Sequence, residues 1–464
     1  MKVCLLNDSF APVIDGVVNV VMNYAEHLIR DHGAEVIVGT PQYPGADYSA
    51  YPYKVVPYQS FDTTAFASGY RAGNPFSSEA AAELAAFAPG ILHSHCPATA
   101  TIMARILRED TEAPIIFTYH TKFDIDIERV VKSKLAVKAG IHAMVSNIEA
   151  CDDVWVVSRG AGESLKALGF QGEYRVMNNG VDFEKGKADP GKVAEVTEGY
   201  DLPEGVPVFL FVGRMMTYKG LPLILDALKQ LSDAGQDFRM VFVGKGPDKE
   251  SMEQKAEELG LKSRCIFTGP IYDREALRAW NTRADLFLFP STFDTNGLVV
   301  REAAACGLAS VLIEGSCAAE GITDGRNGFK IQESPEAMAA LLQTACRDLD
   351  HLRGVGQNAM DEIVLSWQDS VSEAYKRYGE ILEKKKSGLL QKKKLPADYF
   401  MSVTAHTLEE RERHRQIRRE IFRDFRETAV GMMENIQDAG ESVESFLDRV
   451  AENIHEKIDS HKRG

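Results

Sequence analysis

Short apolar runs alternate with amphipathic stretches along most of the chain. Residues 2–6 form an apolar run of strand length, and residues 35–39 form another. Between these two runs lies a stretch with apolar side chains at helical spacing, at Val17, Val20, Val21, Tyr24 and Leu28. Because two strands joined by a helix run parallel in one sheet, this opening predicts a parallel sheet.

The alternation continues in two blocks. The first block predicts strands at 91–94, 114–118, 154–157 and 174–177, and helices at 79–87, 98–109, within 128–149 and at 160–168. The second block predicts strands at 208–213, 240–243, 265–267 and 286–290, and helices at 221–234, 249–259, 274–282 and 298–306. Residues 184–205, rich in Lys, Glu, Gly and Pro, are the expected linker. The fold class is therefore α/β, with two Rossmann-like doubly wound domains, 1–183 and 206–365, facing across a cleft.

Composition agrees with a two-domain globular protein. The chain has 464 residues, of which 44% are apolar and 26% charged. No apolar run reaches the roughly 18 residues of a membrane span. The first residues resemble a strand rather than a signal peptide, so we expect a cytoplasmic location. Seven scattered cysteines without paired spacing argue against both a disulfide framework and a zinc site.

The net charge of −15 divides into −17 for residues 1–383 and +2 for residues 384–464. An acidic body argues against nucleic acid as a partner. The basic segments are candidates for contact with an anionic membrane surface.

Candidate chemistry centres on residues 291–307. The predicted strand 286–290 is followed by a polar turn that ends at Gly297 and then by a helix. The start of a helix offers free backbone N–H groups at the positive end of the helix dipole, which suits a phosphate or a sugar hydroxyl. Asp294 lies just before this helix and Glu302 about one turn inside it, so two carboxylates frame the expected site.

Other polar motifs follow the ends of predicted strands. Because parallel sheets bind ligands at the carboxyl ends of their strands, these motifs are expected to face one cleft. They are Arg214 with Lys219, which suit a diphosphate, Gly244 with Gly246, which suit a nucleobase or ribose, and Asp15, Gly16 and His120 in the first domain. Simpler interpretations stay open for each motif, namely a tight turn for the glycines, surface charges for Arg214 and Lys219, and buried structural roles for His120, His93 and His95.

Ordered motifs along residues 1–382 resemble the retaining, nucleotide-sugar-dependent glycosyltransferases of family 4, which have the GT-B fold. The matching segments are Asp15-Gly-Val-Val18, Tyr119-His-Thr121, Asn179-Gly-Val-Asp182, Val212-Gly-Arg214, Lys219-Gly220, Gly244-Lys-Gly-Pro247, Phe267-Thr-Gly269 and the carboxylate pair Asp294 and Glu302. The resemblance implies that residues 366–383 form a helix that crosses back to the first domain.

The resemblance also implies roles for single residues. Arg214 and Lys219 would hold the diphosphate and Glu302 the ribose. Asp294 with the segment Asn296, Gly297, Leu298 and Val299 would hold the donor sugar, and His120 would lie near its reacting carbon. Family members need no metal ion and no cofactor, because Arg, Lys and the helix dipole stabilise the leaving diphosphate.

Two segments, 294–297 and 315–320, depart from the family pattern. Asp294 stands where Glu is usual, and Thr295-Asn-Gly297 replaces the customary Gly-Phe-Gly. The Thr-Asn-Gly-Leu sequence is similar to the subgroup that glycosylates diacylglycerol, whose members carry Thr-Gln-Gly-Leu. In addition, Gly315–Glu320 stands where a Gly-x-Pro-Glu turn is common.

A lipid acceptor would give the basic segments a role. A basic amphipathic helix carries Lys132, Lys134 and Lys138, and two lysine triplets flank Leu389-Leu390. An ordinary solvated surface is the alternative for both. Residues 384–464 are expected to form a basic linker and an amphipathic helical extension, with 407–460 suited to a partner or a second copy of the chain.

The sequence thus predicts a retaining transfer of a hexose, expected to be glucose from UDP-glucose, to the hydroxyl of a membrane lipid such as diacylglycerol. The protein would lie in the cytoplasm, at the periphery of the inner face of the membrane. The alternatives are a soluble or polysaccharide acceptor, a sugar-nucleotide epimerase and a non-catalytic GT-B partner protein.

Overall fold

The computed structural model describes residues 1–390 except 14, 64–69 and 131, and it leaves out the side chains of 125, 126, 129 and 130. The helical extension expected at 407–460 and the second lysine triplet at 392–394 lie outside the described residues. No helix of the described part is both long and apolar enough to cross a membrane.

The first domain is a seven-stranded parallel sheet in the order β3-β2-β1-β6-β7-β8-β9. Its strands are β1 (Lys2–Leu6), β2 (Glu35–Pro41), β3 (Lys54–Tyr58), β6 (Ile91–Ser94), β7 (Ile115–Tyr119), β8 (Asp153–Val156) and β9 (Arg175–Val176). The helices are α1 (Gly16–His32), α2 (Ser78–Ala86), α3 (Thr99–Thr111), α4 (Phe123–Val130), α5 (Lys134–Glu149) and α6 (Arg159–Ala167). A short antiparallel pair, β4 (Ser60–Asp62) and β5 (Arg71–Gly73), lies beside the main sheet.

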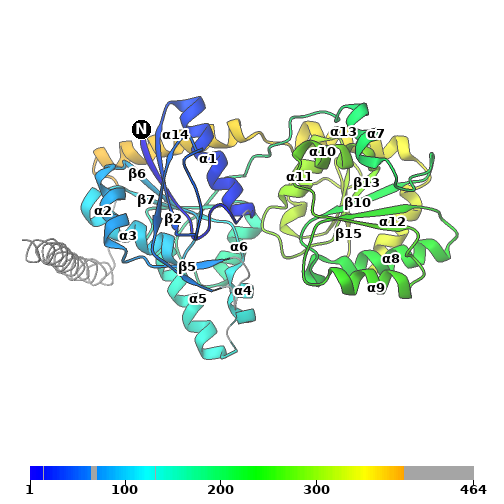
Figure 1. Cartoon of the computed structure of the whole chain (residues 1–464), viewed down its shortest axis with the longest axis horizontal. Helices are drawn as coiled ribbons and strands as arrows, with labels where there is room; N and C mark the ends of the chain where they lie inside the picture. Colours follow the sequence, from blue (N-terminus) through cyan, green and yellow to red (C-terminus); the bar gives the residue numbers. More distant parts are fainter. Residues whose placement is uncertain (14, 64–69, 131, 391–464) are drawn as a thin grey trace, which may run out of the picture. The chain divides into compact units, whose positions relative to one another are not determined.

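The second domain is a six-stranded parallel sheet in the order β12-β11-β10-β13-β14-β15. Its strands are β10 (Val208–Val212), β11 (Arg239–Val243), β12 (Cys265–Gly269), β13 (Leu286–Phe289), β14 (Ser310–Ile313) and β15 (Phe329–Ile331). The helices are α7 (Pro190–Thr197), α8 (Leu221–Asp233), α9 (Lys249–Glu258), α10 (Arg274–Arg283), α11 (Leu298–Ala305), α12 (Pro335–Ala345) and α13 (Leu349–Glu362). They cover both faces of the sheet, with α10 and α13 on one side and α8, α9 and α12 on the other (Figure 1).

Burial on both faces explains why the strands are continuous apolar runs. In β1, Val3 and Leu5 belong to one core cluster and Cys4 and Leu6 to another, on the opposite face of the sheet. Successive strand residues point to opposite faces, so a strand covered by helices on both sides needs apolar residues at every position. The two Rossmann-like parallel sheets expected from the sequence are therefore confirmed.

The last described helix, α14 (Trp367–Lys386), returns to the first domain and packs against α1. Tyr378 donates or accepts a hydrogen bond of 2.5 Å at Nδ1 of His93, and its ring stacks on Trp155. Arg377 binds the carboxylate of Asp153 through two hydrogen bonds of 2.8 Å. The chain thus passes between the two domains twice, once before the second domain and once after it.

Several segments differ from the sequence prediction, and β4, β5, β14, β15, α12 and α13 were not predicted. The expected linker 184–205 contains α7, which packs against α10. The single helix expected within 128–149 is two helices, because Ser133 adopts an extended backbone and its side chain caps α5 by accepting from the Ala136 amide. Strand β3 was not predicted, and its Pro57 fits the edge of the sheet, where a missing N–H costs no ladder bond.

Candidate functional site

Two cavities lie at the carboxyl ends of the strands and share one wall. The first, which we call the interdomain cavity, has a volume of about 420 Å³ and is lined by both domains. The second, the first-domain cavity, has a volume of about 610 Å³ and is lined by the first domain and Arg214. The shared wall consists of Asp15, Val17, Tyr70, His120, Thr121 and Arg214. A group bound in one cavity can therefore reach a group bound in the other.

The topology places these residues together. Both sheets reverse their strand order at a central strand, between β1 and β6 in the first domain and between β10 and β13 in the second. Loops that leave the carboxyl ends of such strands diverge and open a crevice. Asp15 follows β1 and His120 follows β7, while Arg214 follows β10 and Asp294 follows β13.

Asp15 is fixed at the start of α1. Its Oδ1 atom accepts hydrogen bonds of 2.8 Å from the amides of Val17 and Val18 and so caps the helix. Its Oδ2 atom accepts from the hydroxyls of Tyr70, at 2.8 Å, and Ser9, at 3.2 Å. The neighbouring Gly16 has no atom within 4 Å of the position where a Cβ would stand, so the backbone there is open to the cavity.

Asp294 is held by two partners inside the interdomain cavity. The Lys219 ammonium lies 2.5 Å from its Oδ1 atom, and the Ser291 hydroxyl donates to its Oδ2 atom at 2.5 Å. The ammonium also lies 5.8 Å from the ring centres of Phe289 and Phe293. Lys219 and the short Asp294 carboxylate therefore form one fixed pair in the wall of the cavity.

Arg214 is a cation without a hydrogen-bond or ion-pair partner among the described residues. Its side chain is exposed in the wall shared by both cavities, and it makes no hydrogen bond or ion pair with any residue that the structure describes. A guanidinium in this state can bind two oxygens of a phosphate group at once.

The start of α11 supplies a further site for an anion or a hydroxyl. Gly297 has a left-handed backbone with φ of 65°, and a Cβ there would lie 2.8 Å from Cβ of Ala318. A residue with a side chain is therefore disfavoured at position 297 both by the backbone conformation and by the close contact with Ala318. The first amides of a helix have no partner within the helix, and here Leu298 and Val299 line the interdomain cavity.

Thr295 and Asn296 join the two domains. The Thr295 hydroxyl donates to the carbonyl of His120, and the Thr295 carbonyl accepts a hydrogen bond of 2.5 Å from the Ser158 hydroxyl. The Asn296 amide donates to the carbonyl of Val157 at 2.6 Å. We call Ser158, Thr295 and Asn296 the interdomain clamp. The Thr-Asn-Gly sequence, which suggested a lipid acceptor, thus has a structural role of its own.

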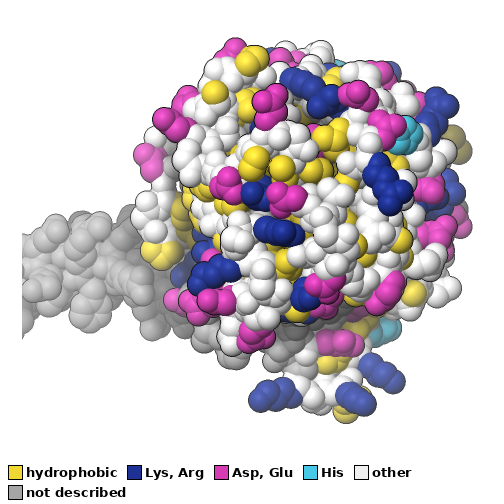
Figure 2. All heavy atoms as spheres, turned by 90° about the vertical axis from the view of Figure 1, so that its right-hand side faces the viewer, with side chains coloured by type: hydrophobic (Ala, Val, Ile, Leu, Met, Phe, Trp, Pro, Cys, Tyr) yellow, Lys and Arg dark blue, Asp and Glu magenta, His cyan; other side chains and the backbone are white. Residues whose placement is uncertain are grey.

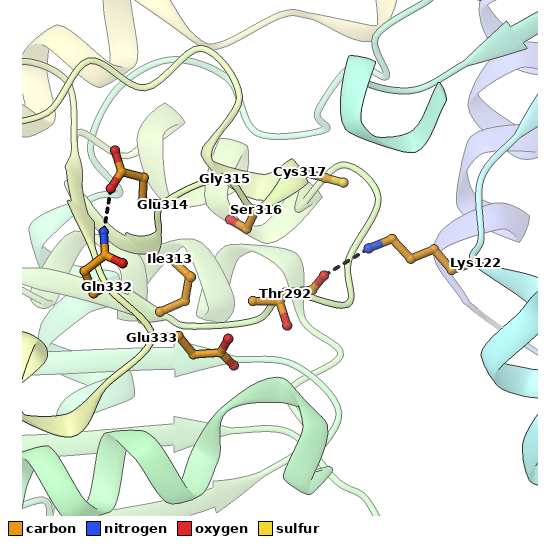
Figure 3. Close-up of a pocket in the computed structure, with 9 residues that line it drawn as sticks. All are labelled: Lys122, Thr292, Ile313, Glu314, Gly315, Ser316, Cys317, Gln332 and Glu333. Atoms are coloured by element: carbon orange, nitrogen blue, oxygen red, sulfur yellow. Dashed lines mark hydrogen bonds between the residues drawn. The ribbon is translucent and has the colours of Figure 1, made fainter. Parts of the chain in front are cut away.

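A third cavity of about 320 Å³ lies next to the clamp, at the carboxyl ends of β14 and β15. Figure 3 shows Lys122 of the first domain reaching across to the carbonyl of Thr292, a hydrogen bond of 3.0 Å. On the other side of this cavity Gln332 donates to Glu314 at 2.7 Å. This hydrogen bond is therefore another link between the domains, and its acceptor, Thr292, lies two residues before Asp294 in the sequence.

His120 lies in the shared wall and is nearly buried, with 9% of its surface exposed. Its Nε2 atom lies 3.0 Å from Nδ1 of His95, a residue that follows β6. Burial lowers the pKa of His120 to about 3, and it lowers the pKa of His95 well below the usual range of histidine. Both rings are therefore neutral at physiological pH.

Three residues predicted to bind the donor lie outside the lining of the interdomain cavity. Gly244 and Gly246 allow the loops after β10 and β11 to touch, since a Cβ would lie 1.9 Å from the Gly213 carbonyl oxygen and 2.2 Å from that of Met215. Glu302 is paired with Arg274 at 2.6 Å. Burial raises the pKa of Glu302, although the Arg274 guanidinium favours its charged form. The roles of Gly244, Gly246 and Glu302 in nucleotide binding stay predictions.

Lys132, Lys134 and Lys138 are exposed around the start of α5, together with Leu135, whose side chain is 79% exposed. Figure 2 shows basic side chains projecting at the lower end of the molecule, where Figure 1 has α4 and α5. Contact of these lysines with a membrane surface stays a prediction.

Several residues of the first-domain cavity were not predicted from the sequence. Asp8 lines it and accepts a hydrogen bond of 2.7 Å from the Ala100 amide at the start of α3. Burial raises the pKa of Asp8 to about 6. Apolar side chains line the same cavity, among them Phe117, Tyr119, Phe123 and Met144. Asp8 follows a strand, like the predicted residues, and this position is the signal that could have identified it.

Comparisons with known proteins agree with this architecture. A Glycosyltransferase Family 4 domain matches residues 14–185, and a Glycosyl transferases group 1 domain matches residues 194–361. Sulfoquinovosyl transferase SQD2 of Arabidopsis thaliana is 28% identical over 365 residues, 75% of this chain and 67% of the relative. Alpha-monoglucosyldiacylglycerol synthase of Streptococcus pneumoniae is 24% identical over 313 residues, 66% of this chain and 70% of the relative. The crystal structure of Anabaena HepE with UDP shares the fold, with a TM-score of 0.65 and 19% identity, over 83% of this chain and 100% of that chain.

Proposed function

Because the chain belongs to the GT-B glycosyltransferases, with a family 4 domain followed by a group 1 domain, we propose that it transfers a hexose from a nucleotide sugar to a hydroxyl group of a membrane lipid. UDP-glucose is the proposed donor and diacylglycerol the proposed acceptor, with retention of configuration at the reacting carbon. The relative named for synthesis of alpha-monoglucosyldiacylglycerol supports this choice of acceptor.

One observation carries the proposal. The interdomain cavity offers cations and a helix start, as a sugar diphosphate requires, and the first-domain cavity offers apolar side chains, as a lipid requires. The two cavities meet at His120, Asp15 and Arg214. A donor and an acceptor bound in them would have their reacting atoms side by side, which is the main requirement for a transfer between two substrates.

In the proposed reaction, Arg214, Lys219 and the first amides of α11 stabilise the charge that develops on the leaving diphosphate. The bond between the anomeric carbon and the diphosphate oxygen breaks, and the acceptor oxygen forms its bond to the same face of that carbon. The acceptor proton passes to an oxygen of the leaving phosphate. A separate general base is then unnecessary, which suits a site whose histidines have strongly lowered pKa values.

The experiment is an incubation of the full chain with labelled UDP-glucose and vesicles that contain diacylglycerol and an anionic lipid. A labelled glycolipid whose anomeric configuration, determined by NMR, matches that of the donor supports the whole proposal. Turnover only on soluble acceptors would overturn the lipid acceptor. Release of UDP without any acceptor would favour an epimerase or hydrolase.

A thermal-shift panel of UDP-, GDP- and ADP-sugars tests the donor independently of the acceptor. At about 100 times its dissociation constant, a true donor raises the free energy of unfolding by about 2.7 kcal/mol. A shift with a GDP- or ADP-sugar in place of UDP-glucose would show that the donor carries a different nucleobase from the proposed uracil. No shift with any of them would favour a non-catalytic partner protein.

A further inference from the structure

Two histidines meet at the first-domain cavity, where His120 belongs to the wall shared with the interdomain cavity and His95 lines the first-domain cavity alone. His95 follows β6 and His120 follows β7, and these strands are parallel neighbours in the sheet. Nδ1 of His95 lies 3.0 Å from Nε2 of His120, and the ring planes are 19° apart. A hydrogen bond between two ring nitrogens needs one proton, so one ring donates and the other accepts.

If both rings are neutral, the protons of His95 and His120 can be placed in only two ways that keep this hydrogen bond. In one, His95 donates from Nδ1 and its Nε2 atom carries a lone pair. In the other, His120 donates from Nε2 and the Nε2 atom of His95 carries a proton. The Nε2 atom of His95 is buried and has no hydrogen-bond partner among the described residues. Buried N–H groups without an acceptor are rare in proteins, and unpaired acceptors are less so.

We infer that His95 is a positioning residue, which donates its Nδ1–H to Nε2 of His120 and thereby leaves His120 with an Nδ1–H group toward the cavities. The Nδ1 atom of His120 has no partner in the described part of the chain, and unlike Nε2 of His95 it is not shut off from solvent. It is the only ring atom of the pair that can bind a substrate oxygen.

The neighbouring His93 does not compete for this bond. Its Nδ1 atom is bonded to the Tyr378 hydroxyl at 2.5 Å and its Nε2 atom to the Thr118 hydroxyl at 2.7 Å. Its ring packs against that of His95, with centres 4.1 Å apart. His93 therefore holds His95 in place by packing, and among the described residues only His95 bonds a ring nitrogen of His120.

The tautomer decides what His120 does in the reaction, and this part rests on the proposed function. With Nδ1–H toward the cavities, His120 donates a hydrogen bond to an oxygen of the sugar or the acceptor. With a bare Nδ1, it would accept the proton of the acceptor hydroxyl and act as the base. The assignment of His95 thus makes His120 a neutral donor and leaves the acceptor proton to the phosphate oxygen.

The first test is NMR of the full chain labelled with ¹⁵N in its histidines, with His120→Asn used to assign the His120 signals. Protonated Nδ1 and unprotonated Nε2 in His120 support the inference. Protonated Nε2, or a mixture of tautomers, overturns it. The result does not depend on whether the protein transfers sugar.

The second test compares variants of His95. In His95→Asn the amide nitrogen can take the place of Nδ1 and donate, while His95→Phe keeps a ring without a donor. We expect His95→Phe to lower kcat about 10- to 100-fold with the KM for the nucleotide sugar changed less than about threefold, as for other residues that orient a ligand's ring. His95→Asn should recover most of the loss.

His93→Phe is the matched control, because it removes an equally buried imidazole that makes no hydrogen bond to His120. It should lower the melting temperature and leave the His120 tautomer unchanged. Equal losses of kcat in His95→Asn and His95→Phe would overturn the positioning role. If His95→Phe does not fold, the NMR assignment and His95→Asn still decide. Absence of any transfer by the unmodified protein would overturn the proposed function and not the tautomer.

Discussion

At the scale of single residues, Arg214 combines a charged side chain with the absence of a partner among the described residues. We expect Arg214→Met to lower kcat/KM about 10²- to 10³-fold, because a cation that stabilises a leaving group acts mainly in the transition state. Its melting temperature should stay unchanged, since no protein contact is lost. Arg175→Met, exposed on β9, is the control and should leave both quantities unchanged. A loss of stability without a loss of rate would contradict the role in catalysis.

Asp294 is one of the positions where the sequence departs from the pattern of the family 4 glycosyltransferases. We expect Asp294→Asn to abolish transfer, with at least a roughly 100-fold loss of kcat, because the carboxylate would bind the sugar while it reacts. The affinity for the free nucleotide, measured by calorimetry, should change less than about threefold. Lys219 loses a partner at 2.5 Å in this variant and stays available to the diphosphate. Loss of nucleotide binding as well would mean that Asp294 orients Lys219 instead.

Asp8 links the first-domain cavity to stability. Burial raises its pKa to about 6 in the folded chain, above the value of about 3.9 expected when unfolded. Between these values the folded state holds more protons than the unfolded state, so stability falls as the pH rises from about 4 to about 6. Asp8→Asn should therefore raise the melting temperature at pH 7, by an amount equivalent to about 1–2 kcal/mol, and leave it unchanged at pH 4.

Thermal unfolding of both proteins across this range measures the effect. The Asn side chain can still accept from the Ala100 amide, so the start of α3 stays capped. If Asp8 also binds the acceptor, Asp8→Asn gains stability and loses activity, as residues of binding sites often do. A melting curve that follows that of the unmodified chain at every pH would show that folding does not raise the pKa of Asp8.

At the scale of elements, the segment between β13 and α11 is tied to the ends of β7 and β8 through the interdomain clamp. The double variant Ser158→Ala with Thr295→Val removes two hydrogen bonds between the domains. At about 1 kcal/mol each, their loss shifts the balance toward open forms about 30-fold. Small-angle X-ray scattering should show a larger radius of gyration without ligand, and a nucleotide sugar should reverse part of the change.

Thr344→Val is the control for the clamp, because its hydroxyl bonds only within α12. It should leave the scattering curve unchanged. If the double variant scatters like the unmodified chain with and without ligand, the clamp does not govern the opening of the cleft.

At the scale of the whole molecule, the acidic body and the basic surface around α5 predict a defined orientation on a membrane. Replacing Lys132, Lys134 and Lys138 by Gln should weaken binding to anionic vesicles about 100-fold, since each basic residue near the surface contributes about 1 kcal/mol. Sedimentation with vesicles measures the binding, and high salt should weaken the binding of the unmodified chain in the same way.

The control replaces three lysines of the second domain, which lie in exposed ion pairs on or next to α8 and α9, namely Lys229, Lys249 and Lys262. It lowers the net charge equally and should bind vesicles like the unmodified chain. Equal losses in both variants would mean that net charge, and not the surface around α5, governs the contact.

The sequence by itself determined the two parallel sheets and most of the residues at the ends of their strands. Strand and helix periodicity is local, and a parallel sheet brings the ends of its strands to one edge, so Asp15, His120, Arg214, Lys219 and Asp294 could be chosen without coordinates. The break between α4 and α5 could not be predicted, because a single cap residue, Ser133, divides a continuous amphipathic pattern.

Only the tertiary structure decided which of these residues face one another. Thr295 meets His120 and Ser158 across the cleft, and His95 meets His120 through the order of β6 and β7 in the sheet. Gly246 proved to be required by the approach of a neighbouring loop. Such contacts join residues far apart in the chain, and they depend on strand order, loop paths and the fit of two domains. No local pattern of side chains contains that information.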